Sequence, residues 1–194
     1  MWQEHQYRKT MRRFEIPEGI RFVTFSCEKR LPLLRHPKIA DCFCTSLVAA
    51  KRRHRFELFA WVIMPEHVHL LMRPAADVRL VPALKAIKQA VSLAVLERWR
   101  ALNAPILKRL EHDGVPRFWM YGGGYDRNVR HAGELRKNVR YIHHNPVRRG
   151  LCPAPADWKW SSAAWWERRP VLPEPKVLCD PLPGSLFGTW NGAD

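Results

Sequence analysis

The sequence predicts an α+β fold of the ferredoxin-like kind, in which a split β-α-β unit forms an antiparallel sheet. Two observations predict it. Short segments rich in β-branched, aromatic and other apolar residues have the length of strands, and other segments repeat apolar residues at helical spacing. Their order is strand, helix, strand, strand, helix, which one more strand completes. A C-terminal helix that carries a tyrosine, and then an irregular tail, follow this unit.

The first half of the chain supplies most of the predicted sheet. Arg21–Ser26 has the aromatic and β-branched residues of a strand, and residues 35–54 then change to a helical period. Residues 56–64, FELFAWVIM, are nearly all apolar, so we expect a strand that is covered on both faces and central in the sheet. A tight turn at residues 64–67 leads into a further strand and predicts a hairpin.

The second half supplies the remaining helices. Apolar residues between Leu84 and Trp99 form one helical stripe, and residues 117–120 are the candidate for the missing strand. We interpret the glycines at 122–124 as a flexible hinge. A third helix is expected over residues 127–144, with Pro146 ending it.

The C-terminal region is rich in tryptophan and proline. We expect the tryptophans to form a cap folded over the core, rather than a platform for stacked bases; they are Trp158, Trp160, Trp165 and Trp166. Five prolines between Pro170 and Pro183 predict an extended or mobile tail. The expected division is a basic N-terminal arm over residues 1–20, a domain over 21–151 and an extension over 152–194.

Charge is the strongest compositional signal. Lysine and arginine total 33 against 18 acidic residues, which gives a net charge of +15. An excess of this size favours a polyanionic partner, above all nucleic acid. No apolar run is long enough to span a membrane, and the N-terminus has no secretion signal. The five cysteines lack zinc-site spacing, so we expect a reduced, cytoplasmic and nucleoid-associated protein.

His67 and His69 are the first candidate site residues. They lie at the start of the apolar run Val68–Met72, which is typical of a strand. Side chains alternate between the two faces of a strand, so both imidazoles project from one face. Two converging neutral imidazoles supply half of a metal site, although hydrogen-bonded polar residues on a sheet face are an equally good interpretation of this spacing alone.

Tyr141 and Asn145 are the second pair. They are four residues apart and therefore share one face of the third helix. Tyr141 lies roughly 130° around the helix from the apolar stripe, where a core residue is not expected. The amide oxygen of Asn145 is a suitable ligand for a hard cation. His143 and His144 are alternative ligands; the helical period turns His143 away from Tyr141 and puts His144 on the other side of it from Asn145.

Both pairs lie in segments that resemble a known family. MPEHVHLL, at residues 64–71, has the His-hydrophobe-His signature of the HUH nucleases. YIHHNPVRRGL, at residues 141–151, resembles the tyrosine motif of the REP-associated tyrosine transposases. These are relatives of single-tyrosine insertion-sequence transposases that act on single-stranded DNA. The resemblance covers about residues 21–164.

The resemblance implies an enzyme that cleaves and rejoins single-stranded or hairpin DNA of the REP type. Tyr141 would be the nucleophile and would form a 5′-phosphotyrosine. His67, His69 and Asn145 would hold Mg²⁺ or Mn²⁺. We expect basic side chains to hold the DNA backbone, and the candidates are Lys85, Lys88, Arg140 and Arg148.

Two alternatives remain open at this point. One is a non-catalytic nucleic-acid-binding module with structural histidines, and the other is a metal-dependent phosphodiesterase that uses water. The sequence leaves open whether the protein is a monomer or a dimer, and which DNA sequence it recognises.

Overall fold

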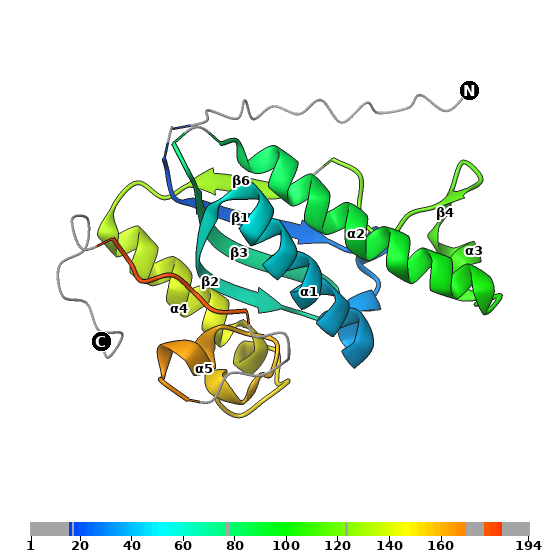
Figure 1. Ribbon diagram of the computed structural model, residues 1–194. Helices are drawn as coiled ribbons and strands as arrows, with labels where there is room; N and C mark the ends of the chain where they lie inside the picture. Colours follow the sequence, from blue (N-terminus) through cyan, green and yellow to red (C-terminus); the bar gives the residue numbers. More distant parts are fainter. Residues whose placement is uncertain (1–15, 17, 77, 123, 170–176, 184–194) are drawn as a thin grey trace, which may run out of the picture.

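The computed structural model (Figure 1) describes residues 16, 18–76, 78–122, 124–169 and 177–183. The predicted N-terminal arm therefore lies almost entirely outside the described residues. Within the described part of the chain, no helix has the length and apolar character needed to cross a membrane.

A four-stranded antiparallel sheet is the centre of the fold. Its strands follow the order β2 (Phe56–Ile63), β3 (His67–Pro74), β1 (Arg21–Ser26) and β6 (Tyr125–Asn128). This order and the helices between the strands confirm the predicted ferredoxin-like architecture. The shorter elements are η1 (Glu28–Arg30), η2 (Leu33–Arg35), α3 (Ile106–Leu110), β4 (Glu111–His112), β5 (Val115–Pro116), η3 (Pro155–Asp157) and α5 (Ala163–Trp166).

Each face of the sheet packs on different helices. α1 (Pro37–His54) and α2 (Leu80–Ala101) share one apolar core with the sheet residues on their side. α4 (Ala132–Arg148) packs on the opposite side, in a second and smaller core. The alternation predicted for β3 is confirmed, because Val68, Leu70 and Met72 enter the first core. The two histidines take the face on which α4 lies.

β2 is an edge strand, so the prediction of a central strand was wrong. Its side chains are buried because its two faces pack in the two cores, and C-terminal segments cover its free edge. The Ile63 amide donates to the Trp160 carbonyl at 2.9 Å, and the Ser162 amide donates to the Trp61 carbonyl at 2.9 Å. Further along the strand, the Asp180 amide donates to the carbonyl of Leu58 at 2.8 Å.

The fourth strand is β6, not the predicted residues 117–120. Phe118 and Trp119 instead pack into the first core, where Trp119 makes an isolated bridge to Cys27. β6 has the polar sequence YDRN, which carries little hydrophobic alternation. A pair of bonds between the Arg21 guanidinium and the Asp126 carboxylate, 2.9 and 2.8 Å long, fastens it to β1.

Gly124 has a steric role next to β6. Its φ is +80°, and a Cβ placed there would lie 1.8 Å from the carbonyl oxygen of Thr24. Gly122 also has a positive φ of +98°, but a Cβ there would meet nothing within 4 Å. The predicted hinge thus includes a glycine that lets two backbones approach, and Gly123 lies outside the described residues.

α4 begins later and ends later than predicted. His131 is its N-cap and accepts a hydrogen bond from the Glu134 amide at 3.2 Å. Pro146 lies inside the helix, where its ring removes only one hydrogen bond close to the end. Gly150, with φ +65°, ends the helix in a Schellman motif: its amide donates to Val147 at 2.9 Å, and the Leu151 amide donates to Pro146 at 2.9 Å.

The tryptophan-rich segment forms the predicted cap. The indole N–H of Trp158 donates to the Ile63 carbonyl, and that of Trp166 donates to the Phe59 carbonyl, both at 2.9 Å. The described part of the tail, residues 177–183, packs on the domain, since Val177 and Cys179 are buried. Residues 170–176 of the predicted mobile tail lie outside the described residues.

We expect Gly124→Ala to destabilise the fold more than Gly122→Ala. Both replacements meet a positive φ, which costs a non-glycine residue about 1–3 kcal/mol. Only the alanine at Gly124 also displaces the backbone of Thr24. Urea unfolding of the two variants checks this, and equal losses in the free energy of unfolding would contradict the close-approach role.

Candidate active site

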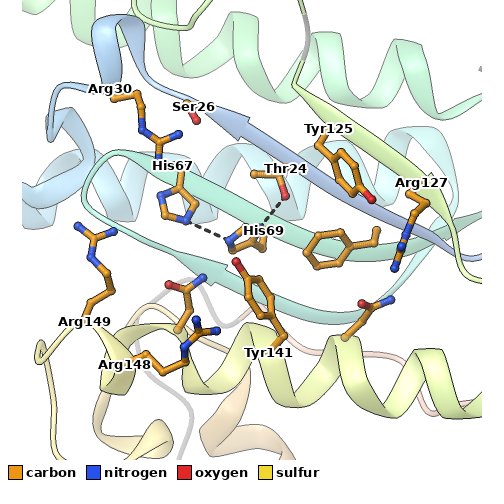
Figure 2. A pocket seen from close by; sticks show the side chains of 13 residues that line it. Thr24, Ser26, Arg30, His67, His69, Tyr125, Arg127, Tyr141, Arg148 and Arg149 are labelled. Atoms are coloured by element: carbon orange, nitrogen blue, oxygen red, sulfur yellow. Dashed lines mark hydrogen bonds between the residues drawn. The ribbon is translucent and has the colours of Figure 1, made fainter. Parts of the chain in front are cut away.

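One cavity gathers most of the residues predicted for the site. It has a volume of about 590 Å³ and lies between the sheet and α4 (Figure 2). Its lining comes from β1, η1, β3, β6, α4 and the residue that follows α4. The lining residues are Phe22, Thr24, Ser26, Arg30, His67, His69, Tyr125, Arg127, Asn138, Tyr141, Asn145, Arg148 and Arg149.

The two histidines face each other inside this cavity. His67 Nε2 lies 3.0 Å from His69 Nε2. The other ring nitrogen of each histidine has its own hydrogen-bond partner. His67 Nδ1 lies 2.9 Å from Glu66 Oε1, and His69 Nδ1 lies 2.6 Å from Thr24 Oγ1. The sheet register explains the last contact, because Thr24 is the residue opposite His69 on β1.

Burial keeps both imidazoles neutral. It lowers the pKa of His69 to about 3, with a smaller contribution from the neighbouring His67. Burial also lowers the pKa of His67, although the Glu66 carboxylate opposes that shift. Neutral imidazole is the form that binds metal ions.

The hydrogen bonds determine which nitrogen of His67 is free. An ionised carboxylate only accepts, so His67 Nδ1 donates to Glu66 and Nε2 keeps its lone pair. A ligand histidine held by a carboxylate through its second nitrogen is a recurrent arrangement in metal sites. His67 Nε2, which is an acceptor, lies 3.0 Å from His69 Nε2. Either a shared proton or a bound cation would satisfy two nitrogens at this distance. The residues therefore fit a divalent metal ion.

Glu66 is a buried carboxylate with two hydrogen-bond donors on it. Burial by itself raises the pKa of Glu66, but the hydrogen bond from Arg149 and the contact with His67 outweigh burial and lower it. Arg149 Nη1 lies 2.7 Å from Glu66 Oε1, and Arg30 Nη2 lies 3.9 Å from the same atom. Glu66 is thus ionised near neutral pH.

Tyr141 projects from α4 toward the histidines. Val139 and Ile142 on the same helix are buried in the second core, while Tyr141 is 39% exposed, so it lies off the apolar stripe as predicted. Its ring centroid lies 5.3 Å from that of His69. Figure 2 shows the hydroxyl end of the ring directed toward the histidine pair. The Arg148 guanidinium lies over the same ring, 5.4 Å from its centroid.

Asn145 lines the cavity one helical turn after Tyr141 and is buried. It lies inside α4, so the expectation that it sits at the helix end and can adjust its backbone was wrong. His143 points elsewhere, as predicted: its Nε2 lies 2.8 Å from Ser162 Oγ, and burial lowers its pKa to about 3. His144 is exposed and does not line the cavity. In the described part of the chain no three histidine, cysteine or carboxylate side chains could together hold a metal ion, so a site here needs a ligand such as an amide.

The rest of the lining suits an anionic ligand. Four arginines surround the cavity, and the described residues that line it include no carboxylate; the arginines are Arg30, Arg127, Arg148 and Arg149. Asn138 is also buried in this wall, and its Nδ2 has no hydrogen-bond partner within the described structure. A donor in that position is available to a ligand.

Three predicted DNA-binding residues lie away from this cavity. Lys85 and Lys88 line a second cavity of about 610 Å³. Phe25 lines it too and belongs to the first core, so this cavity is on the opposite side of the sheet from the histidines. Arg140 is exposed on α4 beside Tyr141 but does not line the first cavity.

Sequence reasoning missed the residues that support the histidines. Glu66 is next to His67, and a carboxylate beside a candidate ligand was a signal available in the sequence. Thr24 and Arg149 contact the site from distant positions, 45 and 83 residues from their partners, and no local spacing indicates them.

Comparisons with known proteins bear on the family and the fold. Residues 20–121 match the family model described as IS200-like transposase. The chain is 27% identical over 160 residues to the REP-associated tyrosine transposase of Escherichia coli K12, which spans 78% of this chain and 80% of that protein. A solved structure of a REP-associated tyrosine transposase bound to a REP hairpin has the same fold, with a TM-score of 0.63 and 24% identity over 84% of this chain and 87% of its own.

Proposed function

This chain belongs to the family of IS200-like transposases, enzymes that cleave and rejoin DNA, and we propose that it does so through a covalent bond between Tyr141 and DNA. The observation that carries the proposal is the position of Tyr141. A partly exposed tyrosine faces two neutral histidines in a cavity surrounded by arginines. Such a cavity favours a phosphodiester, whose charge the guanidinium groups neutralise.

The proposed substrate is hairpin DNA with single-stranded flanks. Support comes from the related transposase that was solved bound to a REP hairpin. The net charge of +15 favours any nucleic acid, so it does not by itself distinguish hairpin from duplex.

The proposed cofactor is Mg²⁺ or Mn²⁺, held by His67, His69 and Asn145. Membership of the family implies a metal-dependent mechanism. The three residues line one cavity and offer two imidazole nitrogens and an amide oxygen. When bound, the ion supplies charge neutralisation and polarisation at the scissile phosphate.

The chain's own residues account for the bonds made and broken. The Tyr141 hydroxyl gives up its proton and its oxygen attacks the phosphorus, while the bond from the phosphorus to the 3′ oxygen breaks. That oxygen takes up a proton, and the strand leaves with a free 3′-OH. The 5′ end stays on the protein as a phosphotyrosine. A 3′-OH from a second strand reverses the attack, so joining needs no nucleotide cofactor.

Basic residues divide into two groups in this proposal. Arg148 lies over the Tyr141 ring and Arg140 lies on the adjacent surface of α4, so we infer that they hold the backbone near the cleaved bond. Lys85 and Lys88 flank an aromatic cavity on the other side of the sheet. We infer that this cavity takes a DNA segment remote from the cleaved bond, with lysine on phosphate and aromatic rings on bases.

We expect Tyr141→Phe to abolish the covalent adduct and to change the free energy of unfolding by less than about 0.5 kcal/mol. The lost hydroxyl is the nucleophile and is not a core group. The test is incubation with end-labelled hairpin DNA and Mn²⁺, followed by denaturing electrophoresis. An adduct in the phenylalanine variant would identify another nucleophile, and two free ends from the wild-type protein would indicate a hydrolase that uses water. Binding of the DNA with neither adduct nor cleavage would indicate a non-catalytic module.

We expect Asn145→Ala to lower the cleavage rate by more than the 10–100-fold that is typical when a partner outside the ligand set is lost. Raised Mn²⁺ is expected to restore part of the rate, because weaker ligation is offset by concentration. His144→Ala is the matched control, one residue away and outside the cavity. Cleavage rates measured across a Mn²⁺ titration decide between Asn145 and His144 as the metal ligand. An inactive His144→Ala together with an active Asn145→Ala would reverse the assignment.

We expect Lys85→Ala and Lys88→Ala each to weaken DNA binding and to reduce its salt dependence. Each phosphate contact to a single strand contributes about 0.7 to the slope of log affinity against log salt. Lys108→Ala, an exposed lysine on α3, is the control. Fluorescence anisotropy with hairpin and fully paired DNA from low to moderate salt measures the slopes. Unchanged slopes in both variants would remove the second cavity from the DNA-binding surface.

A further inference from the structure

One carboxylate connects the histidine strand to the tyrosine helix. Glu66 Oε1 lies 2.9 Å from His67 Nδ1 and 2.7 Å from Arg149 Nη1. Glu66 is 6% exposed, so its charge depends on these partners rather than on water. Figure 2 shows Arg149 and Arg30 on the His67 side of the cavity, and the Arg30 guanidinium is the more distant, at 3.9 Å.

Rigid backbone supports both ends of this connection. The Glu66 carbonyl accepts from the Cys27 amide at 2.9 Å, which fixes the turn between β2 and β3 to the end of β1. Arg149 is the C-cap of α4, and its amide lies 3.2 Å from the carbonyls of both Asn145 and Pro146. The ion pair therefore joins the turn before β3 to the C-terminal end of α4, the helix that carries Asn145 and Tyr141.

We propose that Glu66 and Arg149 are positioning residues for DNA cleavage. Glu66 sets His67 with Nε2 toward the cavity, and Arg149 binds the same carboxylate and thereby sets the end of α4. The position of the histidine pair relative to Tyr141 then depends on the Glu66 carboxylate, which both sides share. This inference rests on the proposed function, but the connection itself is a property of the protein without DNA or metal.

Direct binding of DNA by Arg149 would give a different result in a double-mutant cycle. Its side chain is 47% exposed in the cavity wall, so it could hold a DNA phosphate as we infer for Arg148. A DNA contact acts independently of Glu66, and its loss is overcome by more DNA. A positioning residue acts through Glu66, and its loss persists at saturating DNA. Double-mutant cycles separate the two, because groups that act through one contact are not additive.

The first measurement uses the protein alone. Hydrogen exchange is followed at the amides of Gly150 and Leu151, which close the end of α4. We expect Arg149→Met to speed this exchange by about tenfold because it removes the donor, and Glu66→Gln to speed it because it removes the charge of the acceptor. The double variant is expected to match Arg149→Met, because both changes act on the same ion pair. Arg148→Met, of equal size and charge change, is expected to leave the exchange as in the wild type. Unchanged exchange in Arg149→Met would overturn the proposal.

The second measurement is the single-turnover rate of adduct formation at saturating hairpin DNA and Mn²⁺. We expect Arg149→Met and Glu66→Gln each to lower this rate by about tenfold, as for residues that orient a metal ligand, with no further loss on combining them. Arg149→Lys should recover part of the rate and serves if the methionine variant folds poorly. Arg148→Met combined with Glu66→Gln should give the product of the single effects.

Two outcomes would contradict the inference. Multiplied effects of Arg149→Met and Glu66→Gln, or a loss in Arg149→Met that excess DNA restores, would make Arg149 a DNA contact. Absence of an adduct with the wild-type protein would instead refute the proposed function, and the exchange measurement would still decide whether the carboxylate holds the helix end.

Discussion

The register of β3 against β1 is the constraint on which the site depends. It pairs Thr24 with His69, and strand alternation then puts both histidines under α4 and Val68 under the other helices. A shift of one residue would exchange the faces and bury the imidazoles among apolar side chains. The apolar residues of β3 therefore determine the face on which the histidines lie. Only this register buries the apolar side chains and also places both imidazoles in the cavity.

Burial and charge act in opposite directions around the two histidines, and the site uses both. Burial holds the imidazoles neutral, which is what ligation requires, and by itself it raises the pKa of the Glu66 carboxylate. The hydrogen bond from Arg149 and the contact with His67 outweigh burial and lower the pKa of Glu66. Glu66 and Arg149 illustrate a general property of buried charges, which are tolerated when a partner of opposite charge and good geometry is present. Here the partner, Arg149, caps α4, the helix that also carries Tyr141.

Much of this fold could be predicted from periodicity, and the failures have physical reasons. The helices α1 and α2 have apolar stripes that continue for several turns, so their presence was predictable. β6 was missed because a four-residue polar strand has no such pattern, and the consecutive aromatic residues at 118 and 119 gave a stronger but misleading signal. β2 was assigned to the centre of the sheet because a strand covered by distant segments has the same sequence pattern as a central strand. In the site, His67, His69, Tyr141 and Asn145 were indicated by spacing within one element, whereas the connection from Glu66 to Arg149 joins residues 83 apart and has no sequence signal.

The covering of β2 by the end of the chain also has a consequence for how the protein is made. Ribosomes synthesise a chain from its N-terminus, and Trp61 and Leu58 bond to Ser162 and Asp180, which are 101 and 122 residues later. The histidine strand and the tyrosine helix are thus complete while the apolar edge of β2 is still open. Unpaired strand edges recruit other strands, including those of neighbouring nascent chains. Residues synthesised after α4 are therefore the ones that cover the β2 edge, and the segments that carry His67, His69 and Tyr141 are synthesised before that cover.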